Sequence, residues 1–115
     1  MEILPNADRA IISMEKFKGY VLNLTHEKGM YKALVFDEVL GYNTSNAEIL
    51  ISKIRESICK FPAVFKGHTA YGDKYEIVMR IDGANGRTAN VIISWIIDEE
   101  TEYPRLTTAY IPKRR

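Results

Sequence analysis

The spacing of hydrophobic residues changes near Pro62, from a helical period to the alternation typical of strands. Before Pro62, apolar residues recur every three to four positions, which predicts helices over about 14–21, 29–40 and 45–60. Ser13 is placed to cap the first helix and Gly41 to end the second. Ser45 and Glu48 have the spacing of a capping box for the third helix, whose predicted buried stripe is Ile49, Leu50, Ile54 and Ile58.

After Pro62, apolar and polar residues alternate, which predicts strands over about 74–81, 88–97 and 105–112, with a weaker one over 63–68. The stretch "DGANGR" is rich in turn residues and predicts a hairpin between the two longest strands. We therefore expect a single α+β domain over 1–115, with helices at about 14–60 and a sheet at about 63–112. Two or three N-terminal helices should pack on one face of an antiparallel meander of three to four strands.

Composition excludes several classes of protein. The formal net charge is +1, so no polyanionic partner is required by charge alone. The N-terminus does not resemble a signal peptide and no apolar run is long enough to span a membrane, so we expect a cytoplasmic site of action and no membrane partner. Cys59, the single cysteine, lies in a helical pattern and is predicted to be a buried, inert thiol.

The usual cofactor and metal motifs are missing from the sequence. "GANG" lacks the GxGxxG frame and lies between two predicted strands. His26 and His68 are far apart in the sequence, without a cysteine pair or an HExxH arrangement. We therefore expect neither a cofactor nor a metal ion.

The remaining candidates are polar residues that the fold could gather beside the sheet. His26 and Lys32 flank the start of the second helix, and Thr108 and Tyr110 lie on the last strand. Strict alternation would place Thr108 and Tyr110 on the same face as Leu106. Each residue taken singly has an ordinary structural explanation, since threonine and tyrosine are common in sheets and a loop histidine is usually only solvated.

Together, these residue types suit RNA cleavage without a metal. That reaction needs a base for the 2′-hydroxyl, an acid for the leaving oxygen and a cation for the phosphate. A histidine can perform either proton transfer, and lysine or arginine can hold the phosphate. Arg87 and Arg105 are candidate substrate-binding residues on this reading.

Four segments resemble a family of small bacterial domains of unknown function: "LPNADRAII", "GYVLNLTHEKGMYKALVFDEVLGY", "YGDKYEIVMRIDGANGRTANVIISWII" and "PRLTTAYIP". More distantly, two motifs are similar to the barnase–EndoU–colicin–RelE superfamily of toxin ribonucleases, namely "YxLNxxHxxGxxKAxxF" and "PRLxTAY". The first motif is filled by Tyr20, Leu22, Asn23, His26, Gly29, Lys32, Ala33 and Phe36. The resemblance implies a catalytic site of His26, Lys32, Thr108 and Tyr110.

The resemblance also implies RNA, tRNA or mRNA, as the substrate and an immunity or antitoxin protein as a partner. Such domains can be delivered as part of a secreted toxin. The alternative is a non-catalytic binding module or a structural accessory protein of a phage or mobile element. An exposed "VIISWII" strand at a sheet edge would favour that alternative, because such an edge invites pairing with another chain. The sequence does not indicate an oligomeric state.

Overall fold

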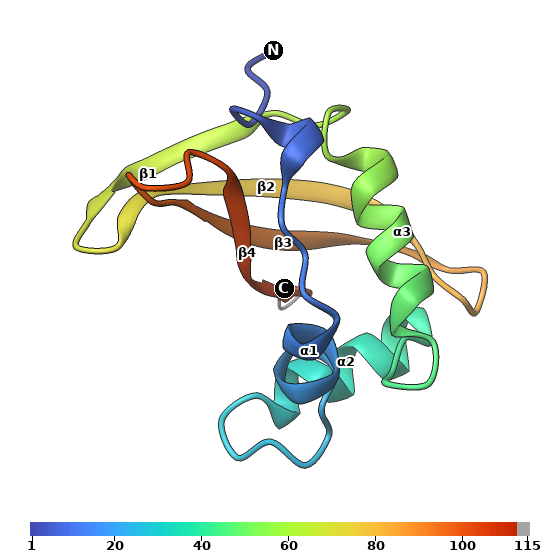
Figure 1. Cartoon of the computed structure of the whole chain (residues 1–115). Coiled ribbons are helices and arrows are strands. Elements are labelled where there is room, and N and C mark those ends of the chain that lie inside the picture. The colour runs from blue at the N-terminus through green and yellow to red at the C-terminus, as the bar shows by residue number, and fades with distance from the viewer. Residues whose placement is uncertain (113–115) are drawn as a thin grey trace.

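A computed structural model describes residues 1–112 and shows helices followed by one sheet, an α+β fold as predicted (Figure 1). The helical elements and strands are, in order, η1 (Ala7–Arg9), α1 (Met14–Lys16), η2 (Phe17–Val21), α2 (Met30–Leu40), α3 (Ala47–Ser57), β1 (Ala63–Thr69), β2 (Gly72–Asp82), β3 (Thr88–Ile97) and β4 (Pro104–Tyr110).

The four strands form an antiparallel meander in the order β1-β2-β3-β4. β3, which contains "VIISWII", therefore lies inside the sheet with a partner on each side. Both edges are partly covered, because Ile11 exchanges backbone hydrogen bonds with β4 and the Ala63 N–H donates to the Glu2 carbonyl. This arrangement removes the exposed apolar edge that would have favoured strand pairing with another chain.

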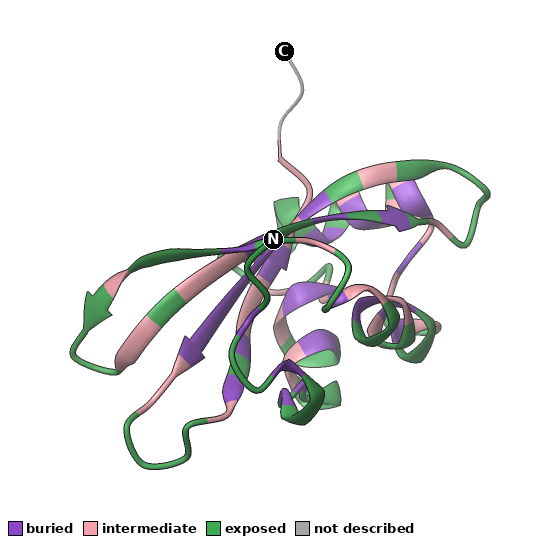
Figure 2. Ribbon diagram, turned by 90° about the horizontal axis from the view of Figure 1, so that it is seen from above, coloured by how far each residue is buried: buried purple, intermediate pink, exposed green. Residues whose placement is uncertain are grey.

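One face of the sheet is packed against the helices and the other, called here the outer face, points away from this core. The helix-side residues of β2 and β3 are fully buried and include Ile77, Met79, Ile93 and Trp95. Figure 2 shows these buried positions along the middle strands and on the helix surfaces that turn toward them. Burying such side chains stabilises the fold by about 1.5–3 kcal/mol each.

The first helix does not continue as a regular α-helix. The Ser13 hydroxyl caps it as predicted, accepting a hydrogen bond from the Lys16 N–H at 3.2 Å. From Phe17 the backbone widens into the π-turn η2, in which the Leu22 N–H donates to the Phe17 carbonyl at 2.8 Å. Such π-turns displace the following side chains from their α-helical positions.

The second helix ends as expected and the third does not begin as expected. Gly41 has a left-handed φ of 72°, and its N–H and that of Tyr42 donate to carbonyls of the last turn of α2. The predicted capping box is wrong, since α3 begins at Ala47 and the Ser45 hydroxyl donates instead to the Asn43 side chain.

The predicted buried stripe of α3 is wrong at one of its four positions. Ile49 is 44% exposed, and Ala47 takes its place in the core beside Leu50 and Ile54.

Cys59 is exposed, because α3 ends at Ser57 and the chain turns before the cysteine. The prediction of a buried thiol is therefore wrong.

Candidate functional site at the start of α2 and the end of β4

Lys32 and Tyr110 join the two sequence motifs. Lys32 lies in the first half of α2 and Tyr110 is the last residue of β4. The Lys32 Nζ atom lies 4.8 Å from the centroid of the Tyr110 ring. A cation over an aromatic ring at an exposed position contributes about 0.5–1 kcal/mol. The helix and strand that carry the candidate residues therefore meet at this point.

A bulge in β4 decides which residues share a face with Tyr110. The register between β3 and β4 shifts between Ser94, which pairs with Thr108, and Trp95, which pairs with Leu106. Leu106 is consequently buried on the helix side, and Thr108 and Tyr110 lie on the outer face. The expectation that Leu106 accompanies them is wrong, because one extra residue reverses the alternation.

Arg105 also lies on the outer face, opposite Ile96. Ile96 is two residues from Ser94 along β3, so the Arg105 row lies about 7 Å from the Thr108 row. Tyr110 pairs with Ile92, which lies four residues from Ile96 along β3, so the Tyr110 row is about 13 Å from the Arg105 row. Arg105 thus flanks Thr108 and is remote from the Lys32–Tyr110 contact.

The Thr108 hydroxyl is enclosed by the protein. Its Oγ1 atom is buried and has no hydrogen-bond partner. A buried hydroxyl without a partner costs about 1–3 kcal/mol relative to a satisfied one. Thr108 is therefore placed on the correct face, but its hydroxyl can reach a ligand only if neighbouring side chains move aside.

His26 is held by the backbone of the loop that precedes α2. Its Nδ1 atom accepts hydrogen bonds from the N–H groups of Lys28 and Gly29, both at 3.1 Å. Its carbonyl accepts from the Met30 N–H at 2.9 Å, so His26 acts as a cap one turn before α2. Because Nδ1 accepts, the proton of the neutral ring is on Nε2. In this arrangement His26 presents a hydrogen-bond donor and not a base.

Arg87 is not brought to this site. It lies in the β2–β3 hairpin, where its N–H donates to the Asn85 side chain. Asn85 in turn donates to the Val39 carbonyl at the last turn of α2. The 11 residues of α2 span about 15 Å, so Arg87 lies at the opposite end of the helix from His26.

The sequence reading missed Glu76 and Ser94. Val64, Glu76, Ser94 and Thr108 pair in one row across the outer face. Glu76 is the carboxylate in that row and is half-buried, without an ion pair. The alternation of 75–81 places Glu76 away from the core, but aligning it with Thr108 required the position of the β4 bulge.

The electrostatics of the helical hairpin 14–40 favour anions near its lysines. Within residues 1–112 the one side-chain ion pair joins His68 to Asp73. Lys16, Lys18, Lys28 and Lys32 are therefore free of direct carboxylate partners, although Glu15 and Glu27 lie nearby in sequence. The basic residues Lys113, Arg114 and Arg115 lie outside the described residues.

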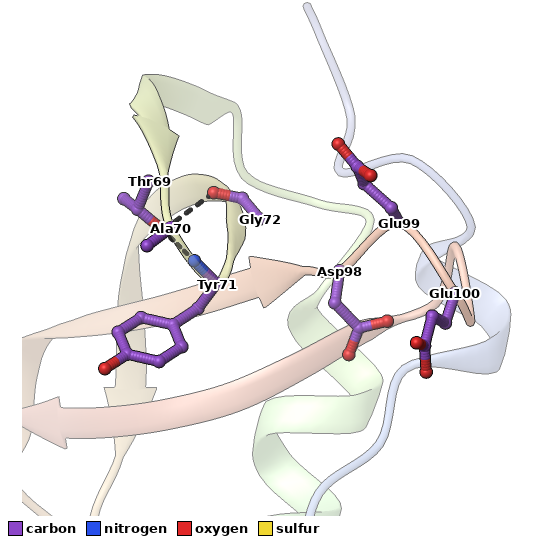
Figure 3. A pocket seen from close by; sticks show the side chains of 7 residues that line it. All are labelled: Thr69, Ala70, Tyr71, Gly72, Asp98, Glu99 and Glu100. Carbon is purple, nitrogen blue, oxygen red and sulfur yellow. Dashed lines mark hydrogen bonds between the residues drawn. The ribbon is translucent and has the colours of Figure 1, made fainter.

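A hollow of the described surface lies elsewhere. It has a volume of about 340 Å³ and lies between the β1–β2 turn and the loop after β3 (Figure 3). Its lining includes the three carboxylates Asp98, Glu99 and Glu100. These carboxylates would repel a phosphate, so this hollow is not suited to bind RNA.

No group of three metal-ligating side chains occurs among residues 1–112. None of the helices in that range has the length and apolar character needed to cross a bilayer.

Comparison with known proteins places the chain in one family. A family model described as "Domain of unknown function (DUF6883)" matches residues 3–113. No curated protein and no solved structure matches the chain. The resemblance to toxin ribonucleases thus stays a prediction, and the function has to be argued from the site.

Proposed function

The chain belongs to that family of unknown function, and from its site we propose a metal-independent ribonuclease-like domain that acts on RNA, tRNA or mRNA. The observation that carries the proposal is the contact of Lys32 with Tyr110, 4.8 Å from Nζ to ring centroid. It joins a cation on the helix that follows the His26 loop to a phenol, and the free ring nitrogen of His26 carries a proton. In the proposed setting the protein is a bacterial toxin that acts in the cytoplasm, with an immunity or antitoxin protein as partner.

In the proposed reaction the 2′-hydroxyl oxygen attacks phosphorus and the 5′ oxygen leaves, producing a 2′,3′-cyclic phosphate. Lys32 holds the phosphate and its developing charge. The Nε2–H group of His26 donates a hydrogen bond to the leaving 5′ oxygen and stabilises its developing charge, and that oxygen takes its proton from water. The 2′-hydroxyl proton passes to water, because Glu76, the outer-face carboxylate in register with Thr108, lies two strands from β4, about 10 Å across the sheet.

The alternative, a non-catalytic binding module or accessory protein of a phage or mobile element, is supported by a different observation. The Thr108 hydroxyl is buried and the His26 Nδ1 is occupied by backbone N–H groups. Both residues are thus explained without chemistry. A surface of this kind can bind an RNA backbone through its lysines and leave the strand intact.

The deciding experiment is incubation of purified protein with total tRNA in EDTA, followed by denaturing gel electrophoresis. We expect fragments that end in a cyclic phosphate, and their loss in the Lys32→Ala, His26→Ala double variant. Intact tRNA at high protein concentration contradicts the proposal, and intact but bound tRNA supports the binding module. Cleavage that survives in the double variant removes this site.

A further inference from the structure

We propose that Lys16 and Tyr20 form a second cationic subsite, so that the protein holds an RNA strand at two phosphates, one at Lys32 and one at Lys16. The choice of RNA rests on the function proposed above, but binding at this subsite does not require cleavage. Neither residue was among the candidates from the sequence.

Lys16 repeats the arrangement seen at Lys32. Its Nζ atom lies 5.4 Å from the centroid of the Tyr20 ring, as Lys32 Nζ lies 4.8 Å from that of Tyr110. Each lysine rests its stem on a tyrosine and keeps its ammonium at the surface. The ammonium is thereby held in place before a ligand arrives, which lowers the entropy lost on binding.

Tyr20 connects the Lys16 ammonium directly to His26. The two rings meet edge to face, with centroids 4.8 Å apart and planes at 82°. The same tyrosine therefore contacts both the second cation and the hydrogen-bond donor. The π-turn η2, which carries Tyr20, packs against both α2 and β4, the elements of Lys32 and Tyr110, and Lys16 is the last residue of α1, directly before η2.

Gly29 leaves the space that the Tyr20 ring occupies. A Cβ atom at position 29 would lie 3.1 Å from Tyr20 Cε1 and 3.3 Å from the Tyr20 carbonyl. A side chain there would require the Tyr20 ring, which contacts Lys16 and His26, to shift by a few tenths of an ångström. The backbone φ of Gly29 is −102°, which any residue can adopt. Glycine is therefore required here by the close approach of the Tyr20 ring and not by its backbone conformation.

Two separate cations, each resting on its own tyrosine, fit a strand with several phosphates better than a mononucleotide. Neither ammonium is neutralised by a carboxylate within 4.0 Å in the described residues. Each lysine that contacts a phosphate releases counterions, so the number of such contacts can be measured from the salt dependence of the affinity for RNA.

The test is binding of a fluorescent 2′-O-methyl RNA strand of about ten nucleotides, which lacks the nucleophile for cleavage. Affinity is measured by anisotropy between about 50 and 200 mM salt. We expect Lys16→Gln to weaken binding about fivefold and to reduce the slope of log K against log salt by about 0.7, as Lys32→Gln does. Lys60→Gln, in an exposed turn beyond α3, should change neither.

Tyr20→Phe should behave as the wild type because the ring remains, and Tyr20→Leu should weaken binding as Lys16→Gln does. A slope that changes in Lys32→Gln but not in Lys16→Gln overturns the second subsite, as does absence of binding at the lowest salt. Binding with the expected slopes but without cleavage of tRNA preserves the subsite and removes the proposed ribonuclease. Cleavage of tRNA together with a wild-type salt slope in Lys16→Gln preserves the proposed ribonuclease and removes the subsite.

Discussion

The two histidines of the chain are held in opposite ways at opposite ends of the sheet. The Nδ1 atom of His26 accepts from two backbone N–H groups, whereas that of His68 faces the Asp73 carboxylate. His26 therefore carries its proton on Nε2 when neutral, and His68 on Nδ1. Each also touches an aromatic ring, Tyr20 for His26 and Phe65 for His68.

The two sites are too far apart to act on one phosphate. Asp73, the partner of His68, lies in the row that reaches β4 at Pro104, and Lys32 lies over Tyr110 at the other end of that strand. The seven residues of β4 span about 20 Å. A His–Asp pair looks more like catalytic machinery than a capping histidine does, yet His26 is the one whose loop carries Lys28 and leads into the helix of Lys32. We therefore assign the catalytic role to His26 from its neighbours along the chain, although His68 has the carboxylate partner.

The largest expected difference between the two histidines is in RNA cleavage. His26→Asn should reduce the cleavage rate about a hundredfold or more, because the hydrogen bond to the leaving oxygen is lost. His68→Gln should leave the rate unchanged. The rates are measured on tRNA in EDTA at equal protein concentration. Equal losses in the two variants would remove the distinction between the histidines.

A second comparison separates the two roles of His26. His26→Ala removes the acceptor of two backbone N–H groups and should lower the free energy of unfolding by about 1 kcal/mol. His26→Asn offers a short side-chain oxygen in its place and should recover most of that loss without restoring cleavage. Urea unfolding of both variants checks this, and equal stabilities would contradict the capping role.

Two glycines test whether the position of Tyr20 matters to His26. Gly29→Ala should lower the cleavage rate about tenfold, because the ring that contacts His26 is displaced. A Cβ at Gly19 meets no atom within 4 Å, so Gly19→Ala is the matched control and should keep the wild-type rate. If both variants cleave at the wild-type rate, the Tyr20–His26 contact is dispensable.

The smallest expected effect concerns acid stability at the His68 end of the sheet. The Thr101 backbone N–H, followed by its hydroxyl, donates to Asp98 and lowers the pKa of that carboxyl. A carboxyl whose pKa is lower in the folded state stabilises the protein above pH about 4. This stabilisation is lost as the pH falls through the pKa of the folded state. Asp98→Asn should therefore lose less stability on acidification than the wild type, as measured by urea unfolding. Glu99→Gln, which removes a carboxylate without a side-chain hydrogen bond, should lose as much as the wild type.

The fold followed from the sequence because its two periods are regular. The switch at Pro62, the turn at 82–87 and the cap at Gly41 all reflect local preferences that the packing reinforces. The capping box at Ser45 failed because Asn43 captured the serine hydroxyl, and no spacing rule ranks two such acceptors.

The candidate site could be predicted only in part. The resemblance selected Lys32 and Tyr110, which do meet, but the face of Thr108 depended on a bulge that strict alternation cannot reveal. Lys16 and Tyr20 were missed because the contact of the Tyr20 ring with His26 is tertiary and joins the π-turn to the loop before α2. Arg87 was attributed to the site from its strand alone, without the hairpin geometry that carries it to the far end of α2.

The most direct test of this account is the protonation pattern of the two imidazole rings, read by long-range ¹H–¹⁵N NMR at a pH where both are neutral. We predict that His26 carries its proton on Nε2 and His68 on Nδ1, and that adding the 2′-O-methyl RNA strand shifts the His26 signals alone. A His26 ring protonated on Nδ1, or a shift confined to His68, would contradict the assignment of the site to the start of α2.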